Sequence, residues 1–304
     1  LINKIMAKSD TSINQMNKLF ENYILVDVGA NLTNRKYLRD LEPVISRAKD
    51  AGVQKIIVSS SSLKSSREAL RLSRIYPGTL YASAGVHPHE AKSWVDDSLA
   101  TLRDIASNCE CVAIGACGLD YNKNFSPPDI QRLVFRQQVY LSTVLSEGLQ
   151  INIQEHILLE LILIDATLYP RSVNLVRIGN SLMAIEFSAR QIEGTEERFL
   201  TKDNSENGLR ALLESGNIQL DRLLVQTDSP FMYPNARAAK LPDHVKNALT
   251  ERSLSFLQRY CTFQRNEPCS LPVIVEIVAA LLGKSPEDIA LATSFNALKV
   301  FGLS

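Results

Sequence analysis

The stretch Ile24-Leu25-Val26-Asp27-Val28-Gly29-Ala30-Asn31 sets the pattern that the rest of the chain repeats. Its apolar residues form a short run that ends at a glycine and a polar residue, which is typical of a buried strand that leads into a loop. From here on, similar apolar runs alternate with amphipathic stretches of about ten to twenty residues. This alternation predicts parallel strands joined by crossover helices, and therefore an α/β fold.

The apolar runs are rich in Val, Ile or Leu and are bounded by Gly, Ser or Pro. They predict strands at Ile24–Ala30, Lys55–Ser60, Leu80–Val86, Val112–Gly115, Leu149–Ile153, Val173–Ile178 and Leu223–Gln226, with an eighth between Met183 and Gly194. Apolar residues at three- and four-residue spacing predict the helices. These are Arg39–Ala51, Ser66–Ile75, Ser98–Ser107, Pro128–Ser146, Pro242–Tyr260, Leu271–Leu282 and Pro286–Phe301. The order predicts a TIM (β/α)8 barrel.

The chain reads as one domain. No internal repeat, low-complexity run or Pro/Gly/Ser-rich linker divides its 304 residues, and single barrels commonly reach this length. We expect residues 24–304 to form the barrel domain and residues 1–23 to be a polar N-terminal extension. The last helix should begin at Ser285, because an N-cap serine precedes a proline and two acidic residues.

The net charge of the chain does not favour nucleic acid, an acidic membrane or any other charged partner. Lys plus Arg and Asp plus Glu both number 33, so the formal net charge is +0 and any nucleic-acid contact must be local. The five cysteines show no CxxC pairing, which favours a reducing compartment. No apolar run reaches about 18 residues, so no membrane partner is expected. We expect an intracellular protein, cytoplasmic or nuclear, with a mitochondrial location left open because the chain starts at Leu1.

Polar residues follow four of the predicted strands at the point where each strand ends. In a barrel of this kind the carboxyl ends of the strands carry the working side chains. The four groups are Asp27 to Asn31, Gly85 to His89, Gly115 to Tyr121 and Gln226 to Pro230. One aspartate at a strand end more often caps a turn than binds a metal, but the four groups together indicate a functional site.

These groups resemble the signature blocks of the TatD deoxyribonucleases. The similar segments are VDVGANLT (26–33), AGVHPH (84–89), AIGACGLDY (113–121), QTDSP (226–230) and RNEP (265–268). The resemblance covers residues 24–149 and 200–304. It implies an amidohydrolase-like barrel that hydrolyses DNA phosphodiesters with divalent metal ions (Mg, Mn or Zn), trimming single strands from the 3′ end.

The resemblance also implies metal ligands that this chain has mostly replaced. The family glutamate in the block around the fourth strand is Ala116 here, and the histidines that end the fifth and sixth strands align with Gln154 and Val176. Methyl and isopropyl groups cannot bind a metal, and a neutral amide binds a divalent ion weakly. Only Asp228 remains as a metal ligand, so we expect the metal to be weakly bound or absent.

The candidate site residues follow from the same blocks. We expect Asp228, His87 and His89 to be the catalytic residues at the barrel mouth, and Asn31, Asp120 and His156 to contact substrate. Asp120 also has a structural interpretation, as an aspartate that orients its loop. His156 is an alternative fifth-strand ligand, since a two-residue shift keeps side-chain direction. The RNEP segment is expected to anchor a helix across the mouth. Aromatic and basic residues show no interleaving of the kind found on single-strand stacking platforms.

Three functional hypotheses remain open at this point. The first is a TatD-type barrel that has lost efficient hydrolysis and acts by binding single-stranded DNA or a protein partner. The second is an active nuclease with a reduced one-metal site made of Asp228, His87 or His89, and His156. The third is a structural subunit whose outer helices are the functional surface, which an exposed apolar patch would reveal.

Overall fold

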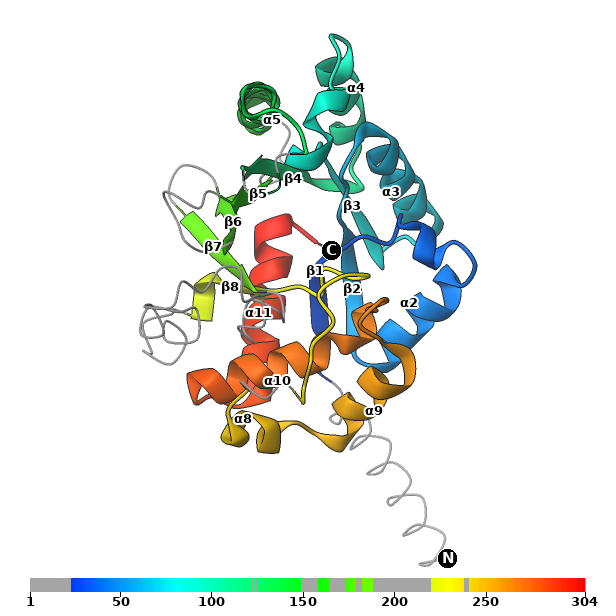
Figure 1. Ribbon diagram of the computed structural model, residues 1–304, viewed down its shortest axis with the longest axis vertical. Helices are drawn as coiled ribbons and strands as arrows, with labels where there is room; N and C mark the ends of the chain where they lie inside the picture. The colour runs from blue at the N-terminus through cyan, green and yellow to red at the C-terminus, as the bar shows by residue number, and fades with distance from the viewer. Residues whose placement is uncertain are drawn as a thin grey trace, which may run out of the picture.

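The computed structural model describes residues 23–121, 123, 125–148, 158–164, 173–178, 182–187, 220–237 and 241–303. These residues form an eight-stranded sheet whose strands follow each other in chain order and curl into a ring (Figure 1). The strands are β1 (Leu25–Ala30), β2 (Val53–Val58), β3 (Leu80–Ala84), β4 (Cys111–Asp120), β5 (Leu158–Ile164), β6 (Val173–Ile178), β7 (Leu182–Phe187) and β8 (Leu223–Val225). The expected α/β barrel class is confirmed.

Short backbone contacts join the first strand to the segment after the last one. Ala30 and Ser229 form a parallel bridge, the Asp228 amide donates to the Gly29 carbonyl at 2.8 Å, and the Asn31 amide donates to the Ser229 carbonyl at 2.7 Å. The carboxyl ends of β1 and β8 therefore meet at one side of the ring. This meeting point positions two of the four polar groups that the sequence singled out.

The sheet is parallel except at β6. Strands β1 to β5 pair in parallel, β6 runs antiparallel to both β5 and β7, and β7 pairs in parallel with β8. The expectation of an all-parallel barrel is wrong at this strand. Only residues 165–172 and 179–181 connect β6 to its neighbours, and a parallel crossover needs about a dozen residues or more. The expected fifth strand, Leu149–Ile153, lies outside the described residues.

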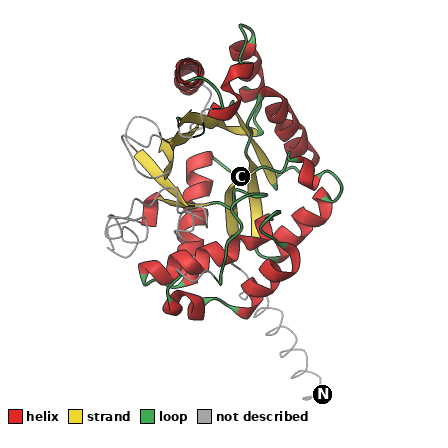
Figure 2. Ribbon diagram, in the orientation of Figure 1, coloured by secondary structure: helices red, strands yellow, loops and turns green. Residues whose placement is uncertain are grey.

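Helices surround most of the ring (Figure 2). They are α2 (Leu41–Asp50), α3 (Leu63–Ile75), α4 (Ser98–Ala106), α5 (Pro128–Gly148), α8 (Asp243–Ala248), α9 (Glu251–Tyr260), α10 (Leu271–Leu282) and α11 (Pro286–Phe301), with the short 3-10 helices η1 (Arg35–Tyr37), η2 (Pro88–Ser93), η4 (Leu220–Arg222) and η5 (Pro268–Ser270). Ser285 caps α11 as expected, since its hydroxyl accepts the Asp288 amide at 3.1 Å.

The helix expected over Pro242–Tyr260 is two helices. Thr250 breaks the run because its side chain accepts the Ser253 amide and so caps α9. The Thr250 amide is satisfied from outside by the buried carboxylate of Glu276 on α10, at 2.9 Å. A capping residue inside an amphipathic run therefore ended one helix and started the next.

Two apolar clusters hold the helices to the sheet. The larger cluster packs α2, α3, α4 and α10 against the strands, with side chains such as Val44, Ala69, Leu102 and Ile274 fully buried. A second cluster joins the end of α11, including Phe301, to strand residues that include those of β1, β2, β4 and β8. Burial of each large apolar side chain stabilises the fold by roughly 1.5–3 kcal/mol.

Within the described ranges, no single helix is long and apolar enough to cross a membrane. The bent pair Pro268–Leu282 and Pro286–Phe301 passes the same test only by length and composition. Most side chains of α10 are fully buried against the barrel, which explains their hydropathy by core packing.

Candidate functional site

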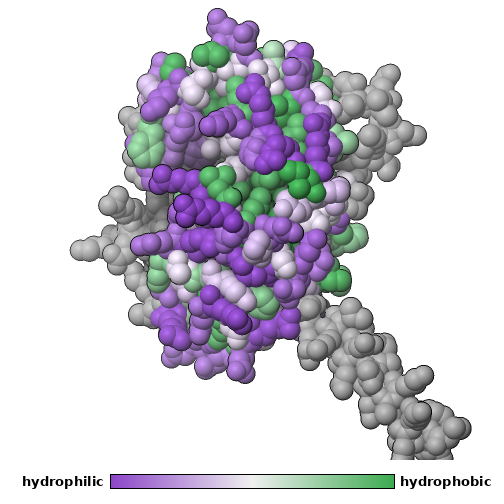
Figure 3. All heavy atoms as spheres, turned by 90° about the vertical axis from the view of Figure 1, so that its right-hand side faces the viewer, coloured by the Kyte–Doolittle hydropathy of each residue, from purple (hydrophilic) through white to green (hydrophobic). Residues whose placement is uncertain are grey.

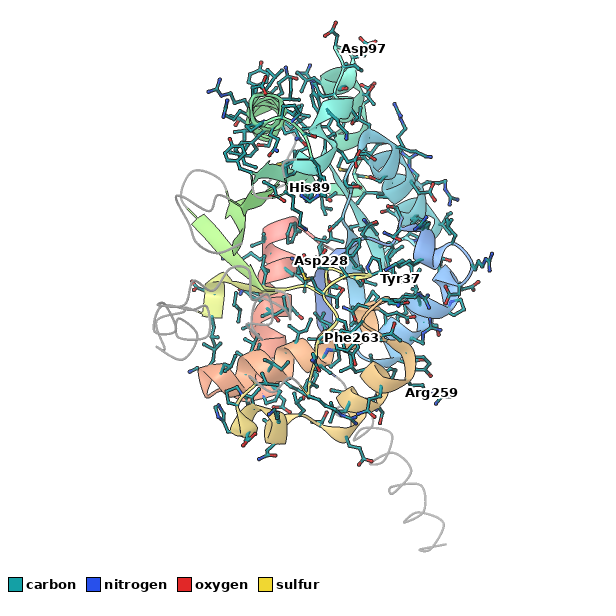
Figure 4. The ribbon with its side chains drawn as sticks, viewed as in Figure 1. Tyr37, His89, Asp97, Asp228, Arg259 and Phe263 are labelled. Carbon is teal, nitrogen blue, oxygen red and sulfur yellow. The ribbon has the colours of Figure 1, made fainter. Side chains whose placement is uncertain are left out.

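Asp228 lies at the mouth of the barrel, just past β8 (Figure 4). Its backbone has φ 49°, the left-handed region that a non-glycine residue rarely adopts. The bonds between the β1 and β8 ends hold it there, since the Asp228 amide donates to Gly29 and its carbonyl accepts the Phe231 amide at 3.0 Å. Residues fixed in this region concentrate at functional sites. The side chain is partly exposed.

Beneath Asp228, a buried carboxylate ties β1 to the segment after β8. Asp27 accepts the Thr227 hydroxyl at 2.6 Å, the Thr227 amide at 3.0 Å and the Gly29 amide at 3.2 Å. Burial raises the pKa of Asp27 to about 7, although these three hydrogen bonds each lower it. Sequence reasoning placed Asp27 in a signature block and assigned it no role. The structure shows that it sets the geometry under the mouth.

A histidine pair follows β3. His87 begins η2, and its Nδ1 accepts the His89 amide at 3.1 Å, which leaves the ring proton on Nε2. Burial, with the neighbouring His89 as a smaller cause, lowers the pKa of His87 to about 3, so its ring is neutral at pH 7. The two rings are 4.3 Å apart in an edge-on arrangement.

His89 is hydrogen-bonded to the buried carboxylate of Asp120 at the end of β4. The ring Nε2 and Asp120 Oδ2 form a short hydrogen bond, and Asp120 also accepts the Lys123 amide at 3.1 Å. Asp120 is 1% exposed and His89 is 25% exposed. The structure thus gives Asp120 the positioning role that the sequence offered as its structural interpretation, and direct substrate contact by Asp120 stays a prediction.

The segment just past the end of β3 approaches the middle of β4 closely at Gly85 and Gly115. A Cβ added at Gly85 would lie 2.5 Å from the carbonyl carbon and oxygen of Gly115, so only glycine fits there. The next residue, Ala116, is 7% exposed, and its amide donates to the Ser60 carbonyl at 3.0 Å. The family resemblance implies a bridging glutamate at this position. Here the side chain is only the methyl group of Ala116.

The RNEP segment anchors helices, as expected. Glu267 receives two hydrogen bonds from the Arg47 guanidinium at 2.8 and 2.9 Å, which link η5 to α2. Arg265 reaches Asp40 at 2.7 Å and Glu267 at 3.2 Å. Glu267 is 1% exposed, and its buried negative charge is paired with the guanidinium groups of Arg47 and Arg265.

The structure brings most of the predicted site residues to one end of the barrel. In Figure 4, Asp228 lies near the centre of the ring with His89 on one side and Phe263 on the other, while Asp97 and Arg259 lie at the periphery. Asn31 joins them through the backbone bond to Ser229, and its side-chain oxygen accepts the Thr33 hydroxyl at 2.9 Å.

The remaining predicted positions do not complete the site. Gln154 and His156 lie outside the described residues. Val176 was expected at the carboxyl end of a parallel sixth strand, but it lies within antiparallel β6, where it pairs with Glu160 and Ala184. Because β6 is antiparallel, Val176 does not lie at the carboxyl end of a parallel strand, and its alignment with the family histidine stays a prediction.

Sequence reasoning missed the aromatic side chains around the mouth. Phe125 packs edge-on against His89 with ring centroids 4.8 Å apart, yet is 56% exposed. Phe231 and Phe263 are 47% and 63% exposed. Phe231 follows the QTDSP block directly, and this adjacency was the available signal.

The described residues do not fit a two-metal centre. Within the described part of the chain, no group of three His, Cys, Asp or Glu side chains is placed to hold a metal ion. Structural and catalytic metal sites use at least three protein ligands of this kind in most cases. Of the nearby donors, His87 Nδ1 accepts an amide, His89 Nε2 binds Asp120, and Asp27 is buried.

The fold and the polar residues at the mouth place this protein in the class of α/β barrels that carry polar groups at the carboxyl ends of their strands. The family model for TatD related DNase matches residues 26–156 and 184–302. The chain belongs to the TatD-related DNase family. It is 31% identical over 282 residues to the 3'-5' ssDNA/RNA exonuclease TatD of Erwinia tasmaniensis, which covers 92% of this chain and 100% of that protein. The Cronobacter turicensis protein of the same name is 35% identical over 279 residues, covering 91% and 97%.

Solved structures agree on the fold. The TatD homolog YJJV from Escherichia coli superposes with a TM-score of 0.66 at 18% identity, covering 92% of this chain and 98% of that one. A TatD family hydrolase from Entamoeba histolytica gives a TM-score of 0.65 at 17% identity, covering 93% and 99%. The family match skips residues 157–183, the same region in which β6 reverses direction.

Proposed function

We propose that this TatD-type protein binds single-stranded DNA or RNA at the barrel mouth and hydrolyses it with strongly reduced efficiency. The family membership supplies the substrate class, since relatives at about 31–35% identity are named 3'-5' ssDNA/RNA exonucleases. The observation that carries the proposed loss of efficiency is Ala116 in β4, at the position where the family resemblance implies a metal-bridging glutamate.

Metal-dependent hydrolysis needs ligands that neutralise the phosphate and activate water. Around the mouth, Asp228 is a partly exposed carboxylate, and Asp27 and Asp120 are buried carboxylates that accept hydrogen bonds. One exposed carboxylate and one neutral imidazole make a poor site for a divalent ion. Binding of nucleic acid requires less, because it needs donors for phosphate oxygens and a surface for bases.

The chain's own residues can perform the binding part. Neutral His87 keeps an Nε2–H that can donate to a phosphate oxygen. Asn31 carries an amide NH2 group on the same side as Asp228. His89, held by Asp120, presents a ring whose orientation is fixed before any ligand arrives.

The test measures binding and cleavage on the same substrate. A single-stranded oligonucleotide labelled at its 3′ end is incubated with the purified protein and Mg or Mn, and nucleotide release is compared with binding measured by fluorescence anisotropy in EDTA. We expect binding with little release. Rapid, EDTA-sensitive release that Asp228→Ala abolishes would show that the chain is an efficient nuclease and would overturn the proposal.

A reduced one-metal site is the second candidate, and the His89 to Asp120 contact favours it. Metal-bound histidines commonly donate their other ring N–H to a carboxylate, as His89 does here. The ligands would be Asp228, His87 or His89, and His156. In the cleavage assay this candidate predicts slow release that rises with metal concentration and that Asp120→Asn reduces.

The structural-subunit hypothesis predicts an exposed apolar patch on the outer helices. On the face shown in Figure 3, hydrophilic side chains dominate and the apolar ones form small groups, which does not favour that hypothesis.

We also propose an intracellular location, supported by the buried thiols of Cys261 and Cys269, whose sulfur atoms lie 3.8 Å apart and form no disulfide. Cell fractionation with an antibody against the native protein tests the location, and recovery in the culture medium would contradict it.

A further inference from the structure

We propose that three loops beside Asp228 form a basic and aromatic surface on which unpaired bases stack. The surface consists of Lys36, Phe231, Tyr233 and Phe263, and the three loops (residues 31–39, 229–237 and 262–266) also carry the exposed Arg35, Arg39 and Arg237. It binds single-stranded nucleic acid by stacking bases on Phe231 and Phe263 while the cations hold the phosphates. The inference rests on the proposed function and deepens it, because it locates the path of the strand outside the catalytic positions.

Backbone hydrogen bonds fix the three loops against one another. The Asn31 amide of the first loop donates to Ser229 of the second at 2.7 Å. The Asn266 amide of the third loop donates to Pro230 of the second at 3.0 Å. The Tyr37 hydroxyl donates to the Asn266 carbonyl, which ties the first loop to the third. The three loops therefore form one preorganised surface.

The two phenylalanines on this surface are exposed and linked by a cation. Phe231 is 47% exposed and Phe263 is 63% exposed, although burial would be favourable for both. The Lys36 ammonium lies 5.7 Å from the centroid of the Phe231 ring and donates to the Gln264 carbonyl next to Phe263. Tyr233 supports Phe263, with ring centroids 4.6 Å apart.

The same loops carry a local excess of positive charge in a chain whose formal net charge is +0. Residues 31–39, 229–237 and 262–266 contain no Asp or Glu, and their cations are Arg35, Lys36, Arg39, Arg237 and Arg265. Arg265 is bound to Asp40, and the other four are exposed. Exposed cations beside exposed rings match the alternation of phosphates and bases along a single strand.

This surface could not be predicted from the order of residues in the sequence. The sequence showed no interleaving of basic and aromatic residues, because Lys36, Phe231 and Phe263 are far apart in the chain. Folding brings them together at the closure of the barrel. The Phe231 amide donates to the Asp228 carbonyl at 3.0 Å, so a base on Phe231 would stand directly beside the mouth.

Single strands fit this surface better than duplexes. Stacking on a ring requires an unpaired base face, which a duplex covers with its own neighbours. Protein–protein interfaces are depleted in lysine, whereas Lys36 lies beside the Phe231 ring and contacts the residue next to Phe263.

The test is anisotropy of a fluorescent single-stranded 12-mer in EDTA, so that cleavage plays no part. We expect Phe231→Ala and Phe263→Ala each to weaken binding by roughly tenfold. The matched control is Phe295→Ala, because Phe295 is also 63% exposed but lies on α11. This control should leave the affinity unchanged, and thermal melting should show that all variants fold.

A second readout separates phosphate contacts from stacking. Lys36→Ala should reduce the slope of log affinity against log salt by about 1, whereas Lys49→Ala on the outer face of α2 should not. A duplex of the same sequence should bind more weakly than the single strand.

Three failures are distinguishable. Single-strand binding that survives both phenylalanine substitutions, or that Phe295→Ala weakens equally, overturns the surface and leaves the proposed function standing. Absence of single-strand binding by the unmodified protein overturns both. Rapid cleavage in Mg with binding lost in the phenylalanine variants overturns only the proposed loss of efficiency and supports the surface.

Discussion

Asp27 shows how one buried carboxylate can govern the mouth of a barrel. It is fully buried and accepts three hydrogen bonds that cross from β1 to the segment after β8. Burial dominates those hydrogen bonds and raises the pKa of Asp27 from 3.8 to about 7. In the folded state this carboxyl therefore binds a proton more tightly than in the unfolded chain.

The first prediction concerns pH and stability. Between about pH 4 and about pH 7 the folded protein retains the Asp27 proton that the unfolded chain has lost, so the stability contributed by that proton falls as pH rises through this window. Asp27→Asn keeps the shape and stays neutral. We expect the melting temperature of the unmodified protein to fall across the window by roughly 5 °C more than that of the variant.

Differential scanning calorimetry of both proteins across the window measures this difference. Parallel curves for the two proteins would show that Asp27 is ionised in the folded state at low pH, and the inferred pKa would be wrong.

At the scale of elements, charged pairs hold η5 against α2 and so support the loop that carries Phe263. Glu267 is nearly inaccessible to water and faces both Arg47 and Arg265. Removing one partner of a buried pair leaves the other charge unmatched, which costs more than the pair contributes. The RNEP segment is thus a structural anchor beside the mouth.

We predict that Glu267→Gln lowers the free energy of unfolding by about 2 kcal/mol, since Arg47 keeps some access to water. The control is Glu68→Gln, which breaks the exposed pair between Glu68 and Arg71 on α3 and should cost less than about 0.5 kcal/mol. Urea denaturation compares the two. Equal effects would mean that burial of Glu267 has no energetic consequence.

Elements at both ends of the chain were predictable from the sequence, and in the middle Val173–Ile178 was predicted with the bounds of β6, but β5 and the antiparallel direction of β6 were not. Strands β1 to β4 and helices α2 to α5 follow from apolar period and bounding residues, and α11 follows from its Ser285 cap. Around β5 to β7, apolar runs such as Leu158–Ile164 do not reveal their direction, because period identifies a strand and not its partners. The mouth was located through the strand ends, whereas Asp27's role depends on contacts with a residue 200 positions away and the aromatic surface depends on contacts among three separate loops.

For the whole molecule, the region of residues 157–183 combines two departures. The family model leaves it unmatched, and it contains the antiparallel strand β6. A ligand restored at position 176 would therefore lack the strand direction that family histidines have. We therefore expect that restoring single ligands is not sufficient and that the segment must be replaced as well.

We predict that Ala116→Glu with Gln154→His restores almost no cleavage, because metal ligands act as a unit. Replacing residues 157–183 by the corresponding segment of the Erwinia tasmaniensis relative, together with those two substitutions, should restore metal-dependent release of nucleotides. The chimera without the two substitutions is the control. Full activity of that control would show that Ala116 does not limit hydrolysis.

We propose that the barrel mouth holds well under one metal ion per chain, and the metal content of the purified protein measures this. The purified protein is dialysed after incubation with excess Mn or Zn, and bound metal is measured by mass spectrometry alongside Asp228→Ala. We predict well under one equivalent per chain for both proteins, because the described donors are too few and largely engaged. One or two equivalents of bound metal per chain, lost in the Asp228→Ala variant, would show that the mouth does hold its metals.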